Sequence, residues 1–70
     1  MKGAEFLRRV KKFAEKTDRE YRFVASHGKG SHGRLYLGTA FTTVKDPNKE
    51  IGFGLLRSMC KDLGIDHSDI

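Results

Sequence analysis

The sequence predicts an α+β domain of two layers, with two helices on one face of a three-stranded antiparallel sheet. Two observations support this prediction. Apolar residues recur at helical spacing near each end of the chain, and three short runs between them alternate or are rich in aromatic and β-branched residues. A chain of 70 residues buries only a thin core, so we expect residues 1–70 to form a single domain.

The first helix is expected over residues 4–16. Its apolar residues recur every three or four positions and predict a buried stripe made of Phe6, Leu7, Val10, Phe13 and Ala14. The charged residues on the opposite side are mostly basic: Glu5, Arg8, Arg9, Lys12, Glu15 and Lys16. The pattern therefore predicts an amphipathic helix with a basic outer side.

Three strands are expected over residues 21–26, 32–37 and 40–44. The glycines at positions 28 and 30 end the first strand. The glycine and threonine at positions 38 and 39 supply a tight reversal between the second strand and the third. The strands should therefore form an antiparallel meander.

The last helix is expected over residues 54–63, after a polar connection that contains Pro47. Its predicted apolar side consists of Leu55, Leu56, Met59 and Leu63. Gly64 stands where a C-cap glycine is common, and the polar residues 66–70 predict a frayed tail.

The positive charge is concentrated in the first half of the chain. Residues 1–35 hold ten Lys or Arg against four Asp or Glu, whereas residues 36–70 hold four against five. A basic half of this kind favours a polyanionic partner, nucleic acid before a membrane surface. The alternative is a basic helix that is simply well solvated.

The chain is expected to be soluble and cytoplasmic. It has no apolar run long enough for a signal peptide, and none approaches the roughly 20 residues that a membrane span needs. Its one cysteine, Cys60, excludes an internal disulfide and fits a reducing compartment. Cys60 falls beside the apolar side of the last helix, which predicts a small buried hydrophobe rather than a nucleophile.

The motifs predict no metal and no cofactor. The candidate metal ligands His27, His32, Cys60 and His67 lack the spacings of zinc sites. The stretch GKGS lacks the rest of a Walker motif and precedes a strand, which argues against nucleoside triphosphate binding. Its glycines either let backbone N–H groups and Lys29 approach a phosphate, or serve only as a hairpin turn.

The side chains best suited to catalysis lie on the expected second strand. Its alternation directs Leu35 and Leu37 to the core and leaves His32, Arg34 and Tyr36 on the open face. An imidazole can take or give a proton near neutrality, and nearby cations can hold a phosphodiester and stabilise its developing charge. RNA cleavage without a metal requires these groups. An exposed histidine beside basic residues is also common on surfaces that perform no chemistry.

The chain resembles one known family. The stretch GSHGRLYLG, the third strand and the later stretch KEIGFGLLRSMCKDLGI are similar to the HicA toxins, messenger-RNA interferases of bacterial toxin–antitoxin pairs. The resemblance covers nearly the whole chain, including the N-terminal helix GAEFLRRVKKF. It implies a fold similar to the double-stranded RNA-binding domain, ribosome-independent cleavage of messenger RNA, and neutralisation by a HicB-type antitoxin.

The resemblance also implies a catalytic residue. The family's catalytic histidine belongs to a Gly-Ser-His motif, which corresponds here to Gly30, Ser31 and His32. We therefore predict a metal-independent endoribonuclease in which His32 is the general acid or base, while Lys29, Arg34 and the loop backbone hold phosphate. Ser31 would position His32 or the 2′-hydroxyl.

Three further positions carry open alternatives. Tyr36 would stack a base or provide a second proton donor. Gly33 stands where the family often has a polar residue, which puts in doubt a role for that side chain. Phe53 stands where a basic or polar residue is common, and it would stack a base, meet the antitoxin or fold back onto the core.

Two other functions compete with the enzyme. A non-catalytic RNA-binding module of the same fold would need no catalytic group. It would lay the basic side of its first helix along a duplex, with Arg8, Arg9, Lys12 and Lys16. An interaction module would use the basic surface to meet an acidic protein. The motif histidine favours the enzyme.

Overall fold

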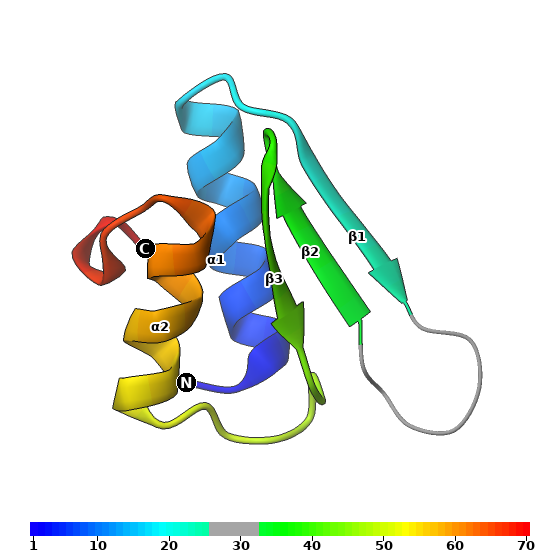
Figure 1. Ribbon diagram of the computed structural model, residues 1–70, viewed down its shortest axis with the longest axis vertical. Coiled ribbons are helices and arrows are strands. Elements are labelled where there is room, and N and C mark those ends of the chain that lie inside the picture. Colours follow the sequence, from blue (N-terminus) through cyan, green and yellow to red (C-terminus); the bar gives the residue numbers. More distant parts are fainter. Residues whose placement is uncertain (26–32) are drawn as a thin grey trace.

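The computed structural model describes residues 1–25 and 33–70 (Figure 1). Within these residues the chain forms two α-helices, three strands and one 3₁₀ turn. The elements are α1 (Gly3–Lys16), β1 (Tyr21–Ala25), β2 (Gly33–Leu37), β3 (Ala40–Val44), α2 (Phe53–Leu63) and η1 (His67–Asp69). The predicted α+β class and the order helix, sheet, helix of a double-stranded-RNA-binding-like fold are confirmed.

The strands form an antiparallel sheet in the order β1-β2-β3, which confirms the predicted meander. The register aligns side chains across the sheet in rows. One row runs from Arg22 through Tyr36 to Phe41, and the next runs from Val24 through Arg34 to Thr43. The reversal between β2 and β3 uses Gly38 with a positive φ of 62°, which a glycine adopts without strain.

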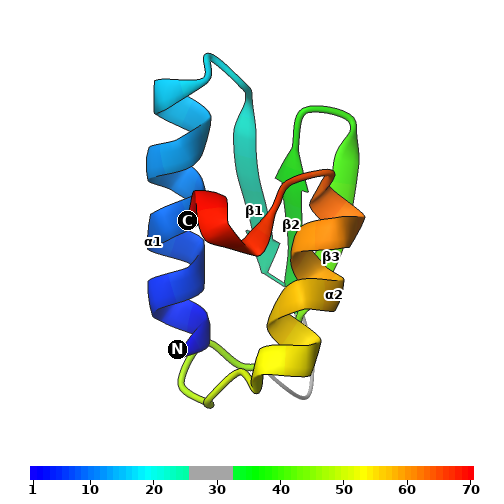
Figure 2. The same cartoon turned by 90° about the vertical axis from the view of Figure 1, so that its left-hand side faces the viewer.

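The domain has two layers, with α1 and α2 both on the same face of the sheet (Figures 1 and 2). None of the described elements covers the other face. The first helix runs alongside the sheet with its apolar stripe inward, and α2 lies next to β3. None of the helices in the described part of the chain is long and apolar enough to cross a membrane.

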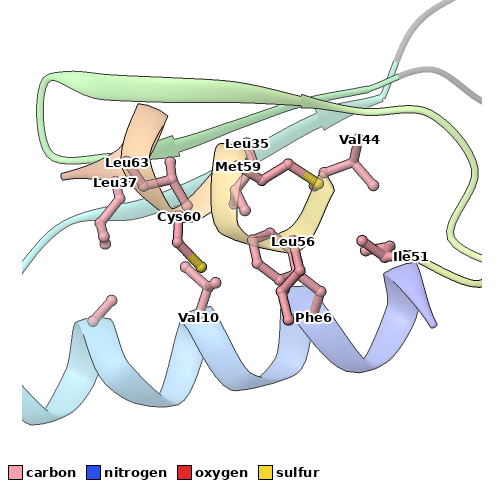
Figure 3. Close-up of a cluster of buried hydrophobic side chains, with 11 residues drawn as sticks. Phe6, Val10, Leu35, Leu37, Val44, Ile51, Leu56, Met59, Cys60 and Leu63 are labelled. Atoms are coloured by element: carbon pink, nitrogen blue, oxygen red, sulfur yellow. The ribbon is translucent and has the colours of Figure 1, made fainter. Parts of the chain in front are cut away.

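The core lies between the helices and the sheet (Figure 3). Its most deeply buried side chains come from α1, β2, β3 and α2: Phe6, Val10, Leu35, Val44, Cys60 and Leu63. The predicted burial of Cys60 is confirmed. Thr42 is also buried, and its Oγ1 donates a hydrogen bond to Oδ2 of Asp62 at 3.0 Å, which ties β3 to α2.

The prediction that Leu55 belongs to the buried side of α2 is wrong, because its side chain is 48% exposed. Adjacent helical residues point about 100° apart, so Leu55 and Leu56 cannot both occupy the centre of one stripe. Leu56, Met59, Cys60 and Leu63 form the buried stripe instead.

The N-terminus of α1 is tied to the loop that follows β3. Gly3 is buried, its N–H donates to the Lys49 carbonyl at 3.1 Å, and the Ala4 N–H donates to the Pro47 carbonyl at 2.8 Å. A Cβ at Gly3 would lie 2.8 Å from the Cα of Pro47. The close approach of the two backbones therefore requires a glycine at this position.

The chain end differs from the frayed tail that the sequence predicted. Helix α2 ends at Gly64, whose φ of 73° is the predicted left-handed C-cap. Asp66 then accepts a hydrogen bond from the Ser68 N–H at 3.0 Å, and Asp69 Oδ2 accepts one from the Asp66 N–H at 3.2 Å. This reciprocal capping box holds residues 67–69 in one turn, which lies between α2 and α1 in Figure 2, and Ile70 packs against the core.

Candidate nucleic-acid interface

Four of the nine predicted site residues lie outside the described residues. Lys29, Gly30, Ser31 and His32 belong to residues 26–32, which join Ala25 of β1 to Gly33 of β2. Ala25 and Gly33 are paired across the sheet. The roles given to the four residues therefore stay predictions, and the chain enters β2 directly after His32.

Arg34 and Tyr36 lie on the open face of the sheet, where the alternation placed them. The alternate residues Leu35 and Leu37 are buried on the core side of β2. Arg34 is exposed and Tyr36 is half-buried on the other side. Arg34 is the second residue of β2 and lies near the end of the sheet at which the Gly-Ser-His motif joins it. The structure therefore brings this pair of predicted residues onto one surface.

The open face carries an ordered layer of two arginines and two aromatic rings, which we call the Arg–aromatic layer: Arg22, Arg34, Tyr36 and Phe41. The rings of Tyr36 and Phe41 are cross-strand partners with centroids 5.8 Å apart and planes tilted by 40°. The Arg22 guanidinium carbon lies 5.9 Å from the Tyr36 ring centroid, and that of Arg34 lies 4.9 Å from the Phe41 centroid. These distances are those of cation–π contacts.

Sequence reasoning missed Arg22 and Phe41. Alternation within β2 predicts the face of Tyr36 but does not place Arg22 of β1 or Phe41 of β3 beside it. Arg22 is exposed on β1, and Phe41 is 48% exposed on β3, both in the row of Tyr36. The signal that would have found them is the period of two in all three strands combined with an antiparallel register.

The open face is positively charged. None of the residues in β1, β2 and β3 is Asp or Glu, and Thr43 and Val24 complete the second row without adding charge. Lys45 follows β3 and is exposed. A surface of this composition attracts anions and offers aromatic area beside the charges.

The predicted RNA-binding residues of α1 lie on a different surface. Arg8, Arg9 and Lys12 are exposed on the side of α1 that faces away from the sheet, and Arg9 forms an ion pair with Glu5 at 2.8 Å. Since both helices cover the face opposite Arg34 and Tyr36, the structure divides the predicted RNA-binding set into two surfaces on opposite sides of the domain (Figure 2).

The packing of Phe23 leaves no room for a side chain at Gly33. Gly33 is buried, and a Cβ at this position would lie 2.4 Å from Cζ of Phe23, whose ring covers it from the neighbouring strand. The Val24 carbonyl oxygen would be 3.2 Å away. The position that follows the motif histidine therefore serves the packing of β1 on β2.

Phe53 does not fold back onto the core, because its side chain is 61% exposed at the start of α2. The His67 ring meets it edge to face at a centroid distance of 5.2 Å, and the Arg57 guanidinium carbon lies 5.9 Å from its centroid. His67 Nδ1 also lies 3.3 Å from Asp66 Oδ1. The cluster belongs to the helix side of the domain, and whether Phe53 meets a base or the antitoxin stays a prediction.

Three titratable groups in the described residues have shifted pKa values. Burial raises the pKa of the Tyr21 hydroxyl. Hydrogen bonds from the N–H and hydroxyl of Ser68 lower the pKa of the Asp66 carboxyl. Burial raises the pKa of the Cys60 thiol, so this sulfur is held in its protonated form. Among residues 1–25 and 33–70, no group of three or more His, Cys, Asp or Glu side chains could hold a metal ion.

The fold and this surface define a class of protein: a small two-layer α+β domain whose uncovered sheet face is cationic and aromatic. The comparison with protein families is more specific. The family model described as "HicA toxin of bacterial toxin-antitoxin" matches residues 7–65, and the chain belongs to this family. Membership of a toxin–antitoxin family implies an antitoxin partner. Comparisons with curated proteins and with solved structures found no match.

Proposed function

We propose that this chain is the toxin of a type II toxin–antitoxin pair and acts as a metal-independent endoribonuclease on messenger RNA, with His32 as general acid or base. The observation that carries the proposal is the family match over residues 7–65, which includes the Gly-Ser-His motif. The cationic face that begins two residues after His32 supports it, because an RNA substrate needs positive charge near the reacting phosphate.

The chemistry requires a proton transfer at each end of the reacting phosphodiester. A base removes the proton of the ribose 2′-hydroxyl, and the resulting oxygen attacks phosphorus. The bond from phosphorus to the 5′-oxygen then breaks, and an acid protonates that leaving oxygen. An imidazole suits either transfer near neutral pH, and such a group contributes about 10²–10⁴ in rate. In this scheme Lys29 and Arg34 hold the phosphate, and Ser31 positions His32 or the 2′-hydroxyl.

Tyr36 has two possible roles in the scheme. Its ring is half-buried against Phe41, and the Arg22 guanidinium lies over it. A ring held in this way is oriented for stacking on a base, and its hydroxyl is a potential proton donor for the leaving oxygen. A Tyr36→Phe variant keeps the ring and removes the hydroxyl, so a loss of cleavage with retained affinity would assign the second role.

The antitoxin is proposed to be of the HicB type and to neutralise the toxin by covering the motif region. We place the pair in the cytoplasm, where messenger RNA is translated, and expect growth arrest when the toxin is free. An antitoxin that covers the motif should compete with RNA, so the addition of purified antitoxin should release bound RNA and stop cleavage in equal proportion.

A second candidate is a non-catalytic RNA-binding module, and one observation favours it. The exposed basic residues of α1 lie away from the sheet and could follow the phosphates of a duplex without any contribution from the motif. Such a module would bind RNA and leave it whole.

Incubation of RNA with the purified chain in EDTA separates the two candidates. The enzyme should produce fragments at the same rate with and without EDTA, since no metal takes part. The binding module should leave the RNA intact, with an affinity that falls steeply as salt is added. Cleavage that EDTA abolishes would contradict the metal-independent mechanism.

A further inference from the structure

We infer that the open face of the sheet is a stacking surface for the unpaired bases of a single-stranded nucleic acid. The inference rests on the proposed function, because it takes RNA as the ligand. It adds the strand state of that RNA and two residues, Arg22 and Phe41, that the proposed catalytic scheme does not use. The Arg–aromatic layer carries it.

The two rings of the layer are arranged for contact with planar ligands. The rings of Tyr36 and Phe41 lie on neighbouring strands with their centroids 5.8 Å apart, and the pairing of β2 with β3 fixes the positions of the two backbones. The Phe41 side chain is 48% exposed, and Val24 in the next row is 39% exposed. Apolar area of this kind on an uncovered face is typical of a binding surface.

The two arginines give the same surface affinity for an anion. The Arg34 guanidinium carbon lies over the Phe41 ring, 4.9 Å from its centroid, and that of Arg22 lies over the Tyr36 ring at 5.9 Å, so each ring carries a cation on one face. A guanidinium plane stacks on bases and forms paired hydrogen bonds with phosphate. Two adjacent rings, each with a guanidinium over it, suit a polymer that carries both bases and phosphates.

The geometry distinguishes single strands from duplexes. In a duplex the base faces are covered by neighbouring bases, and an A-form helix is recognised through its phosphates and 2′-hydroxyls. The exposed rings of the layer would contribute nothing to that recognition. Unpaired bases present their faces, and stacking on aromatic side chains contributes about 1–3 kcal/mol per base. The side-chain rows are two residues apart along the strands, about 7 Å, so the layer suits a short run of nucleotides.

The test measures binding without cleavage. The probe is a fluorescein-labelled 2′-O-methyl RNA of about 12 nucleotides, whose blocked 2′-oxygen cannot attack the phosphate. Fluorescence anisotropy gives the affinity of the chain for this single strand and for the same strand annealed to its complement. The variants are Phe41→Ala, Phe41→Tyr and Arg22→Gln. Leu55→Ala is the matched control, because Leu55 is also 48% exposed but lies on α2, on the other side of the domain.

Phe41→Ala should weaken single-strand binding by about 5- to 140-fold, the equivalent of losing one stacked base. Phe41→Tyr should retain the affinity, Arg22→Gln should weaken it and reduce its salt dependence, and Leu55→Ala should stay within about twofold of the unmodified chain. Circular dichroism checks that each variant is folded.

Three results would overturn the inference: equal losses for Phe41→Ala and Leu55→Ala, tighter binding of the duplex than of the single strand, or loss of antitoxin binding with unchanged RNA affinity. The last result would assign the face to a protein. Cleavage of unmodified RNA is measured separately, so an enzyme that still cuts RNA after Phe41→Ala with unchanged affinity would contradict this inference and leave the proposed function intact.

Discussion

The replacement Gly33→Ala tests how the residue after the motif histidine is constrained. The added Cβ would lie 2.4 Å from Phe23 Cζ and 3.2 Å from the Val24 carbonyl oxygen, both closer than normal contact. The backbone of Gly33 does not adopt a left-handed conformation, so alanine is excluded by the neighbouring ring and not by its own φ. Phe23 must therefore turn away from β2 and give up part of its packing.

The expected cost follows from two opposing effects. Insertion of a methyl group into a packed site costs about 1–3 kcal/mol. The loss of glycine flexibility in the unfolded chain returns about 0.4–1 kcal/mol. The net destabilisation is between about 0 and 2.6 kcal/mol, against the roughly 4–10 kcal/mol expected for a domain of this length.

Urea unfolding followed by circular dichroism measures the change. At a slope of about 1 kcal/mol/M, the midpoint should fall by up to about 2.6 M. Gly54→Ala is the matched control, since a Cβ at Gly54 meets nothing within 4 Å and the residue lies in α2. This control should be stabilised, because alanine favours a helix. The reasoning is refuted if Gly33→Ala is as stable as the control, or if Gly33→Ala remains destabilising when Phe23 is also replaced by Ala.

Three other predictions follow from the described residues. Leu35→Ala, at a fully buried side chain, should cost about 2–5 kcal/mol in urea unfolding, and a loss below 1 kcal/mol would contradict the assignment of Leu35 to the core. Cys60 should react with a thiol reagent only as the domain opens, because it is buried and its pKa is raised, so fast labelling at neutral pH without denaturant would be contrary to the structure. The Asp66 carboxyl has a lowered pKa in the folded state, so its contribution to the C-terminal turn is present above about pH 4 and is lost as the pH falls through the folded value. An NMR titration should show the Ser68 amide losing its protection from exchange, relative to the intrinsic rate at each pH, only in that acid range.

The arrangement of elements was predictable because each local signal agreed with the others. The apolar period of α1, the alternation of β2 and the glycines at 38 and 64 each favoured the same fold, and both glycines adopt the positive φ that their positions need. The errors came from packing. Leu55 and Leu56 have equal hydropathy, and only the position of β3 against α2 decides which of them is buried.

The 3₁₀ turn at the chain end was not predicted, although Asp66 and Asp69 have the spacing of a capping box. Arg22 and Phe41 were also missed. Their proximity to Tyr36 and Arg34 depends on the register of three strands, and no single segment contains it. The prediction that His32 is catalytic rests on the family resemblance, whereas pattern alone predicts only an exposed histidine beside basic residues.

The most direct test of the proposed function compares two histidine variants on one RNA. Wild-type chain, His32→Ala and His67→Ala are incubated with unlabelled messenger RNA in EDTA, and fragments are followed over time. His67 lies against Phe53 on the helix side, so it controls for the loss of an imidazole elsewhere in the domain. The account predicts that His32→Ala binds RNA and leaves it whole, with a rate at least about 10²-fold below wild type, while His67→Ala cleaves normally. Cleavage by His32→Ala at the wild-type rate would contradict it.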